Sequence, residues 1–149
     1  MNILLIGSLA ESLTNFRGPL IAAMLARQAE VHVAAPDLLP GSEAGVKLVA
    51  MGCTVHSISL ARAGTNPLAD SRTLFSLLRL MRVVRPTAVL AYTIKPVIYG
   101  MLAARIAGVP KRFALITGLG YAFQASKTGR LQKLVQVLYK QALKGARKV

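Results

Sequence analysis

Four short stretches of the chain are almost wholly apolar, and they restrict its possible folds more than any other feature. They are residues 2–6, 31–35, 88–92 and 113–116. Half-exposed strands alternate between apolar and polar residues, whereas parallel strands covered on both faces are apolar throughout. Residues 54–60 form a further strand candidate. The pattern therefore predicts a parallel sheet that is buried between two layers.

Segments with helix start and stop residues separate these strands. Pro19 fits the first position of a helix with Gly18 as its cap, although Asn15 could cap an earlier start. Asp70 or Ser71 is expected to cap a later helix. Residues 7–18 and 61–69 are expected to be loops. The predicted helices cover residues 19–29, 42–51, 71–84, 96–107 and 129–144.

Strands that alternate with helices, joined by right-handed crossovers, predict a doubly wound sheet of order 3-2-1-4-5. The expected architecture is an α/β, Rossmann-like domain of three layers, α/β/α. At 149 residues the chain has the length of one such domain. No apolar run approaches the ~18 residues of a membrane span. No basic segment precedes the first strand, so no signal peptide is expected.

The charge of the chain is unevenly distributed. The net charge is +14, and all five acids lie in the first 70 residues together with four bases. The remaining residues carry fifteen bases and no acid. Such a field attracts polyanions, including anionic lipid and diphosphate substrates. Nucleic acid is not expected as a partner, because Tyr121 and Phe123 alone do not make a stacking platform for bases.

The final predicted helix, residues 129–144, combines an apolar side with a basic side. Its basic residues fall within an arc of about 100°. This arrangement suits an anionic membrane surface, although an ordinary solvated helix face is the alternative. The earlier predicted helix of residues 71–84 could extend the basic patch through Arg72, Arg79 and Arg82 beside Phe75. The residues predicted to face the membrane are Arg130, Lys133, Lys140 and Lys144.

Ligands of doubly wound sheets bind at the carboxyl ends of the strands, near the point where the strand order reverses. Three loops are expected to meet there, residues 7–18, 93–96 and 117–123. Glycine amides, with two nearby cations, could hold an anionic or hydroxyl-rich ligand. Alternatively, the glycines only form tight turns and the cations are solvated. The predicted cleft residues are Gly7, Ser8, Asn15, Arg17, Thr93, Lys95, Thr117, Gly118, Gly120 and Tyr121.

Candidates for acid–base chemistry are few. His32 and His56 lie within predicted strands and are expected to be satisfied sheet residues. Glu11 is the only acid expected near the cleft. Without paired carboxylates or metal-ligand spacing, we predict no metal and assign no catalytic residue.

A dinucleotide-binding domain is a weaker alternative. The Gly118-Leu-Gly120 sequence lacks the third glycine of that fingerprint and does not follow the first strand. Asp37, however, ends the second strand, where a ribose-binding acid would lie. We therefore keep a nicotinamide-binding domain only as an alternative, and predict no cofactor.

Several motifs resemble those of a known enzyme family. The chain resembles, over essentially its whole length, the N-terminal domain of bacterial family 4 glycosyltransferases, which have the two-domain GT-B fold. It is similar to the branch that extends sugars on polyprenyl diphosphate carriers for surface polysaccharides and lipopolysaccharide. The motifs are Asn15-Phe-Arg-Gly-Pro-Leu-Ile21, Asn66-Pro-Leu68, Tyr92-Thr-Ile-Lys-Pro96, Tyr99-Gly100 and Phe113-Ala-Leu-Ile-Thr-Gly-Leu-Gly-Tyr-Ala-Phe123.

The resemblance implies retaining transfer from a nucleotide sugar, usually UDP-linked, without a metal. In that family the N-terminal domain chiefly binds the acceptor, and the C-terminal domain binds the donor and supplies a Glu-x7-Glu element. Arg17, Lys95, Gly118 and Gly120 carry over as cleft-lining positions. Many relatives have histidine-containing sequences after the fourth strand, where this chain has Tyr92-Thr93-Ile94.

The expected organisation follows from this resemblance. Residues 1–149 would form one acceptor-side domain, and the donor domain would be absent from the chain. Alone, the chain would be inactive, as a piece of an enzyme or as one subunit of a split enzyme. The expected location is cytoplasmic, peripheral on the inner face of the cell membrane. The alternative from a different class is a non-enzymatic adaptor that binds membranes.

Overall fold

The predicted sheet and its strand order are confirmed. A computed structural model of the chain describes residues 1–61, 66–117 and 129–144. They contain a five-stranded sheet of order β3-β2-β1-β4-β5, in which every pair is parallel. The strands are β1 (Asn2–Ile6), β2 (Glu30–Ala35), β3 (Thr54–Ser57), β4 (Ala88–Tyr92) and β5 (Lys111–Leu115).

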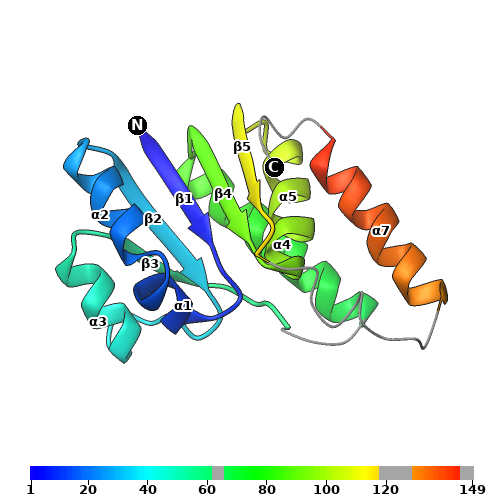
Figure 1. Ribbon diagram of the computed structural model, residues 1–149, viewed down its shortest axis with the longest axis horizontal. Helices are drawn as coiled ribbons and strands as arrows, with labels where there is room; N and C mark the ends of the chain where they lie inside the picture. Colours follow the sequence, from blue (N-terminus) through cyan, green and yellow to red (C-terminus); the bar gives the residue numbers. More distant parts are fainter. Residues whose placement is uncertain (62–65, 118–128, 145–149) are drawn as a thin grey trace.

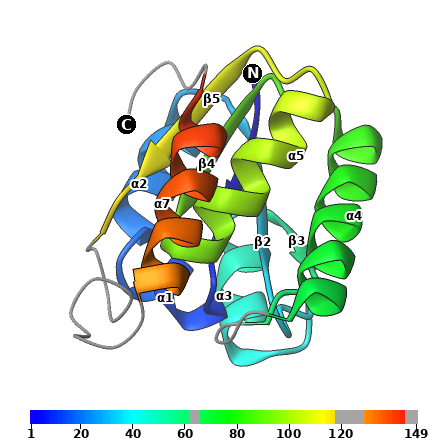
Figure 2. The ribbon, with the colours of Figure 1, turned by 90° about the vertical axis from the view of Figure 1, so that its right-hand side faces the viewer.

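Helices cover both faces of the sheet (Figures 1 and 2). One face packs against α1 (Ala10–Asn15), α2 (Gly18–Ala26) and α3 (Glu43–Ala50). The other packs against α4 (Pro67–Val84), the short π-helix η1 (Pro96–Gly100), α5 (Met101–Ile106) and α7 (Gly129–Leu143). Among the described residues, no helix is long and apolar enough to cross a membrane.

Strand β1 shows why the apolar runs predict a buried sheet. Ile3 and Leu5 pack into the core on the side of α1 to α3. Leu4 and Ile6 pack into the core on the side of α4, α5 and α7. All four are at most 4% exposed. A strand with two buried faces needs apolar residues at every position, as the sequence has.

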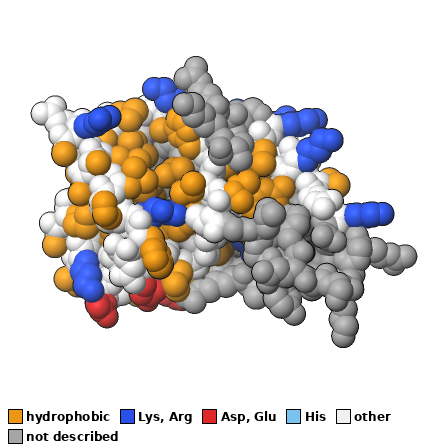
Figure 3. Space-filling model, in the orientation of Figure 1, with side chains coloured by type: hydrophobic (Ala, Val, Ile, Leu, Met, Phe, Trp, Pro, Cys, Tyr) orange, Lys and Arg blue, Asp and Glu red, His pale blue; other side chains and the backbone are white. Residues whose placement is uncertain are grey.

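Strand β5 differs from its prediction. It begins at Lys111, two residues before the predicted start, and it is not fully buried. Leu115 and the following Ile116 are 36% and 37% exposed. The cause is topological, since β5 is the last strand of the sheet and α1 to α3 lie over the opposite half (Figure 1). Hydrophobic side chains accordingly gather near the centre of this face of the molecule (Figure 3).

Two predicted loops contain helix instead. Helix α1 lies within residues 7–18, where Ala10 and Leu13 turn inward. Helix α4 begins at Pro67, ahead of the predicted caps Asp70 and Ser71. Asn66 is its true cap, because its Oδ1 accepts hydrogen bonds from the amides of Leu68 and Ala69 at 3.0 and 3.4 Å. Asparagine followed by proline is a favoured helix start, so this boundary was present in the sequence.

Smaller differences concern the ends of elements. Helix α2 ends at Ala26 and β3 at Ser57, both earlier than predicted. The predicted helix of residues 96–107 forms, but its first turn is the π-helix η1. Helix α7 matches its prediction to within one residue.

Candidate functional site

A pocket of about 400 Å³ lies at the carboxyl ends of β1 and β4. These two strands are adjacent, and the chain leaves them toward opposite halves of the sheet, so the pocket lies at the switch point of the topology. The arrowheads of both strands end at the edge where α1 lies (Figure 1). We call it the switch-point pocket. Its lining residues are Ser8, Leu9, Ser12, Phe16, Arg17, Tyr92, Thr93 and Thr117.

Tyr92 forms the buried wall of the pocket. Its side chain is 2% exposed, and its hydroxyl lies 2.8 Å from Ser12 Oγ. Ser12 Oγ donates its only proton to the carbonyl of Leu9 at 2.6 Å, so the Tyr92 hydroxyl must be the donor to Ser12. Burial raises the pKa of Tyr92. The phenol is therefore a neutral, fixed group at physiological pH.

Arg17 supplies the charge of the pocket. Its guanidinium carbon lies 4.8 Å from the centre of the Tyr92 ring, a cation–π contact. Its Nε atom is buried and has no hydrogen-bond partner among the described residues. The described residues that line the pocket include no carboxylate, and Glu11 is exposed on α1 outside this lining. A buried N–H without a partner is uncommon in proteins, and an anionic oxygen would satisfy it.

Gly7 has a packing role. A Cβ atom at this position would lie 2.8 Å from Tyr92 Cζ, far inside normal contact. The Gly7 amide donates to the carbonyl of Ala34 at 2.9 Å. The structure thus uses this amide within the sheet, contrary to the expectation that it faces a ligand. Glycine is needed here because Tyr92 crosses directly over the backbone.

Thr93 occupies a strained position. Its φ is +69°, in the left-handed region that β-branched residues rarely adopt. Its Oγ1 donates to Ser8 Oγ at 2.9 Å, which joins the loop after β4 to the loop after β1. Strain of this kind costs about 1 to 3 kcal/mol and concentrates at functional sites. It supports a ligand-binding role for this edge of the sheet.

Lys95 lies next to the pocket but does not line it. Its Nζ atom forms an ion pair of 2.9 Å with Asp70 Oδ1, and the two side chains are 14% and 15% exposed. Burial and a hydrogen bond to Asp70 raise the pKa of Tyr99 to about 12. Lys95 therefore anchors the loop after β4 to the first turn of α4, instead of presenting a free charge to a ligand.

The structure brings together four of the predicted cleft residues, Ser8, Arg17, Thr93 and Thr117. Asn15 is exposed at the end of α1 and, like Gly7 and Lys95, does not line the pocket. Gly118, Gly120 and Tyr121 lie outside the described residues. Sequence reasoning missed Leu9, Ser12, Phe16 and Tyr92. The four-residue spacing of Ser12 and Phe16 at the end of α1 was the available signal.

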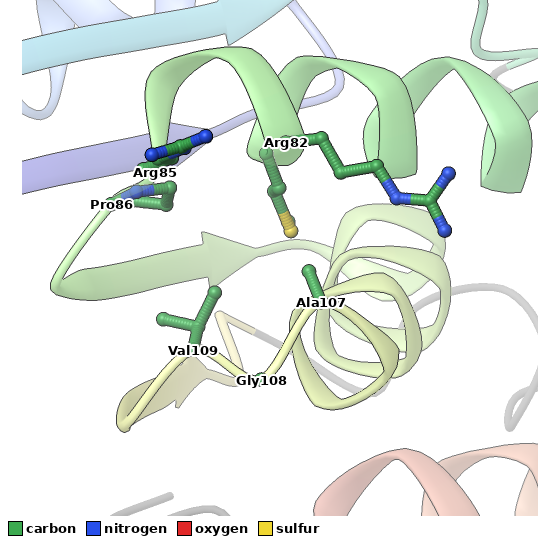
Figure 4. A pocket seen from close by; sticks show the side chains of 7 residues that line it. Arg82, Arg85, Pro86, Ala107, Gly108 and Val109 are labelled. Atoms are coloured by element: carbon green, nitrogen blue, oxygen red, sulfur yellow. The ribbon is translucent and has the colours of Figure 1, made fainter.

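A second hollow, of about 530 Å³, lies at the amino ends of β4 and β5. Met81, Pro86, Ala107 and Val109 form much of its surface. Arg82 and Arg85 border it, but their guanidinium groups point away from Ala107 and Val109 (Figure 4). It lies at the opposite edge from the loops that bind ligands in such sheets, so we do not assign the site to it.

The switch-point pocket can bind hydroxyl groups and an anion, but its described lining contains no acid–base pair. Ser8, Thr93 and Thr117 line the pocket with hydroxyl groups, together with Arg17. The side chain of Phe16, which also lines it, is 72% exposed. Within the described part of the chain, no group of three or more His, Cys, Asp or Glu residues could hold a metal ion.

The chain matches a model of a protein family described as "Glycosyl transferase 4-like" over residues 2–149. It is 32% identical over 137 residues to an N,N'-diacetylbacillosaminyl-diphospho-undecaprenol alpha-1,3-N-acetylgalactosaminyltransferase of Campylobacter jejuni subsp. jejuni. The aligned part is 91% of this chain and 35% of that relative. The chain thus spans about a third of the relative's length.

Solved structures share the fold. A UDP-N-acetylglucosamine 2-epimerase superposes with a TM-score of 0.66 at 14% identity, over 98% of this chain and 40% of the other. MurG of Acinetobacter baumannii superposes with a TM-score of 0.55 at 22% identity, over 77% of this chain and 33% of the other. The glycosyltransferase SsfS6 of Streptomyces sp. SF2575 superposes with a TM-score of 0.56 at 21% identity, over 96% of this chain and 44% of the other. The predicted fold class, one Rossmann-like half of a GT-B architecture, is confirmed.

Proposed function

Since the chain belongs to the glycosyl transferase 4-like family, we propose that it forms the acceptor-binding half of a retaining glycosyltransferase. The complete enzyme would move a sugar from a nucleotide-sugar donor, UDP-linked, to a glycan carried on polyprenyl diphosphate. The name of the Campylobacter relative describes an undecaprenol diphosphate acceptor, which supports this substrate class. The product would serve the synthesis of surface polysaccharide or lipopolysaccharide.

The observation that carries this proposal is the unpaired Nε of Arg17 in a pocket lined with hydroxyls. A lipid-linked acceptor offers three chemistries, namely sugar hydroxyls, a diphosphate and an apolar chain. Serine and threonine hydroxyls bind the first, and Arg17 binds the diphosphate through charge-assisted hydrogen bonds. The exposed ring of Phe16 stacks against a sugar or contacts the first isoprene unit.

This domain would bind the acceptor, and the C-terminal domain would bind the donor. The part of the switch-point pocket's lining that the structure describes has neither an acid nor a histidine, so this pocket would bind and orient an acceptor without activating it. The nucleotide donor and the Glu-x7-Glu element would belong to the C-terminal domain, whether that domain follows in the same chain or comes from a partner subunit. We expect the chain alone to be inactive. Adding a donor domain, UDP-sugar and lipid-linked acceptor would restore transfer.

Replacing Arg17 by glutamine tests the acceptor site. We expect the chain to bind a polyprenyl-diphosphate-linked sugar about 10- to 100-fold more weakly, because charged hydrogen bonds contribute about 1.5 to 3 kcal/mol. Binding would be measured by calorimetry with a short-chain acceptor analogue. Arg27→Gln is the matched control, since Arg27 is exposed just after α2 and outside the pocket. Equal binding by Arg17→Gln and the control would contradict the proposal.

A second surface supports a membrane location for this enzyme. The solvent side of α4 carries Leu68, Phe75 and Val83, which are 64%, 71% and 75% exposed. Arg72, Arg79 and Arg82 lie on the same side, within about 100° of the helix circumference. The only acid on α4, Asp70, is 15% exposed and paired with Lys95. Apolar side chains between arginines suit the headgroup region of an anionic bilayer.

Helix α7 extends this surface. Lys133, Lys140 and Lys144 are exposed, as is Val137 at 55%. The side chain of Arg130 lies outside the described residues. Helix α5 lies between α4 and α7 on the same side of the sheet (Figure 2). We infer that this side faces the inner surface of the cell membrane, which would supply the lipid-linked acceptor. A non-enzymatic adaptor would use the same surface. The Arg17→Gln experiment distinguishes an adaptor from an acceptor-binding domain, because only the latter binds a polyprenyl-diphosphate-linked sugar.

Vesicle flotation tests the membrane surface. Lys140→Glu combined with Lys144→Glu is expected to weaken binding to anionic vesicles by about 30-fold or more, at about 1 kcal/mol per base. The control combines Arg27→Glu with Lys47→Glu, which changes the net charge equally on the side of α2 and α3. If both double variants lose binding equally, overall charge and not this surface is responsible.

A further inference from the structure

A groove of about 520 Å³ runs between the edge strand β3 and helix α4. It shares no lining residue with the switch-point pocket. Its walls are mostly apolar, and the described residues that line it include no acid. We call it the β3–α4 groove. Its lining residues are His56, Ser57, Ile58, Phe75, Ser76, Arg79, Leu80 and Val83.

A pair of histidines lies at this groove. His56 lines it, and His56 Nε2 lies 2.9 Å from Nδ1 of the buried His32 on β2. The two rings are stacked, with centroids 5.2 Å apart. His32 Nε2 in turn lies 3.1 Å from Glu30 Oε1. In the sheet, Ala34 of β2 pairs with His56 of β3, and His32 lies two residues before Ala34. The two histidines are therefore diagonal neighbours on adjacent strands, on the face toward α4.

The protons of this network can be assigned by elimination. The Glu30 carboxylate only accepts, so His32 Nε2 carries a proton. With His32 neutral, its Nδ1 accepts from the Nε2–H of His56, and Nδ1 of His56 is then unprotonated. One more proton can bind there without breaking a hydrogen bond. It converts Nδ1 of His56 from an acceptor into a donor and gives the pair a single positive charge.

The charged surroundings of His56 decide when that proton binds. The groups around it are His32 and, through His32, Glu30 on β2, together with Arg79 on α4. Burial and the neighbouring His32 lower the pKa of His56, so the ring is mostly neutral in the free protein at neutral pH. An anion bound beside His56 and Arg79 would favour the charged ring and raise that pKa.

We propose that the β3–α4 groove binds one anionic lipid molecule, with its phosphate head held by His56 and Arg79 and its chain against Phe75 and Val83. Arg79, with no acid among the described lining residues, favours a negative head, and the apolar walls favour an alkyl chain. Phe75 and Val83 are exposed to 71% and 75%, so they are available to a chain entering from outside. This site is separate from the acceptor pocket and goes beyond the proposed function.

Titration with octyl phosphate, which stays monomeric, tests the proposal without a membrane. We expect saturable binding at about pH 6 and, once the second ionisation of the ligand near pH 6 is allowed for, binding about tenfold weaker at about pH 8, because His56 takes up a proton on binding. The imidazole nitrogen resonances of His56 should move to the protonated range on saturation. Inorganic phosphate and octanol are the comparison ligands. If either binds as well as octyl phosphate, the groove recognises only an anion or only an alkyl chain, and the proposal is overturned.

Two variants and a control complete the test. Arg79→Gln changes an exposed side chain, preserves the fold and is expected to weaken octyl phosphate binding about tenfold. His56→Gln is expected to remove the dependence on pH. Arg105→Gln changes an exposed arginine of α5 outside the groove and should leave binding unchanged. Unaltered binding by Arg79→Gln, or His56 resonances that do not move at saturation, would overturn the proposal.

Discussion

Replacing Asp70 by alanine is expected to lower the free energy of unfolding by about 3 to 5 kcal/mol, the largest loss from one substitution considered for this chain. The substitution leaves the ammonium of Lys95 without its partner at a site where both side chains are about 15% exposed. It also removes the hydrogen-bond acceptor of Tyr99. Urea unfolding followed by circular dichroism would measure the loss.

The control for this prediction removes both charges. Combining Asp70→Ala with Lys95→Met should recover most of the stability, because no buried charge then remains unpaired. The double variant also removes the ion pair that holds the loop after β4 to α4, so acceptor binding should be weaker than in the unmodified chain although stability returns. A loss below about 1 kcal/mol for Asp70→Ala would show that water solvates the pair as it does a surface ion pair.

Replacing Gly7 by alanine is expected to destabilise the chain by about 2 to 3 kcal/mol, in the range of overpacked cores. The new Cβ atom would lie 2.8 Å from Tyr92 Cζ, and Tyr92 cannot easily move. Its hydroxyl is bonded to Ser12, and the guanidinium of Arg17 covers its ring. We therefore expect acceptor binding to fall together with stability, since Tyr92 and Arg17 both line the pocket.

Gly18→Ala is the matched control for Gly7→Ala. A Cβ atom at Gly18 would meet nothing within 4 Å, and the residue begins helix α2. Alanine there should be neutral or should stabilise the chain by up to about 1 kcal/mol. A second check combines Gly7→Ala with Tyr92→Leu, where the two effects should be less than additive. Additive effects would show that the Gly7 contact is not with Tyr92.

Local sequence patterns determined most of the fold. The apolar runs marked the strands β1, β2 and β4, because two-sided burial demands apolar residues at every position. Alternation with helices and the right-handed crossover rule favoured the order 3-2-1-4-5, and the structure has this order. The carboxyl edge, where Ser8, Arg17, Thr93 and Thr117 meet, followed from this topology.

Tertiary structure decided which of these residues face a ligand. Lys95 lies in a predicted cleft loop, yet Asp70 of α4 forms an ion pair of 2.9 Å with its Nζ atom. Lys95 is therefore paired and does not present a free charge to a ligand. Gly7 donates its amide to Ala34 and makes room for Tyr92, a contact across 85 residues of chain. The exposure of β5 depended on its place at the edge of the sheet. The sequence by itself determined the strands, their order and every described helix except α1, because periodicity and caps act over a few residues. Partners distant in the chain depend on register and packing, which only the folded sheet sets.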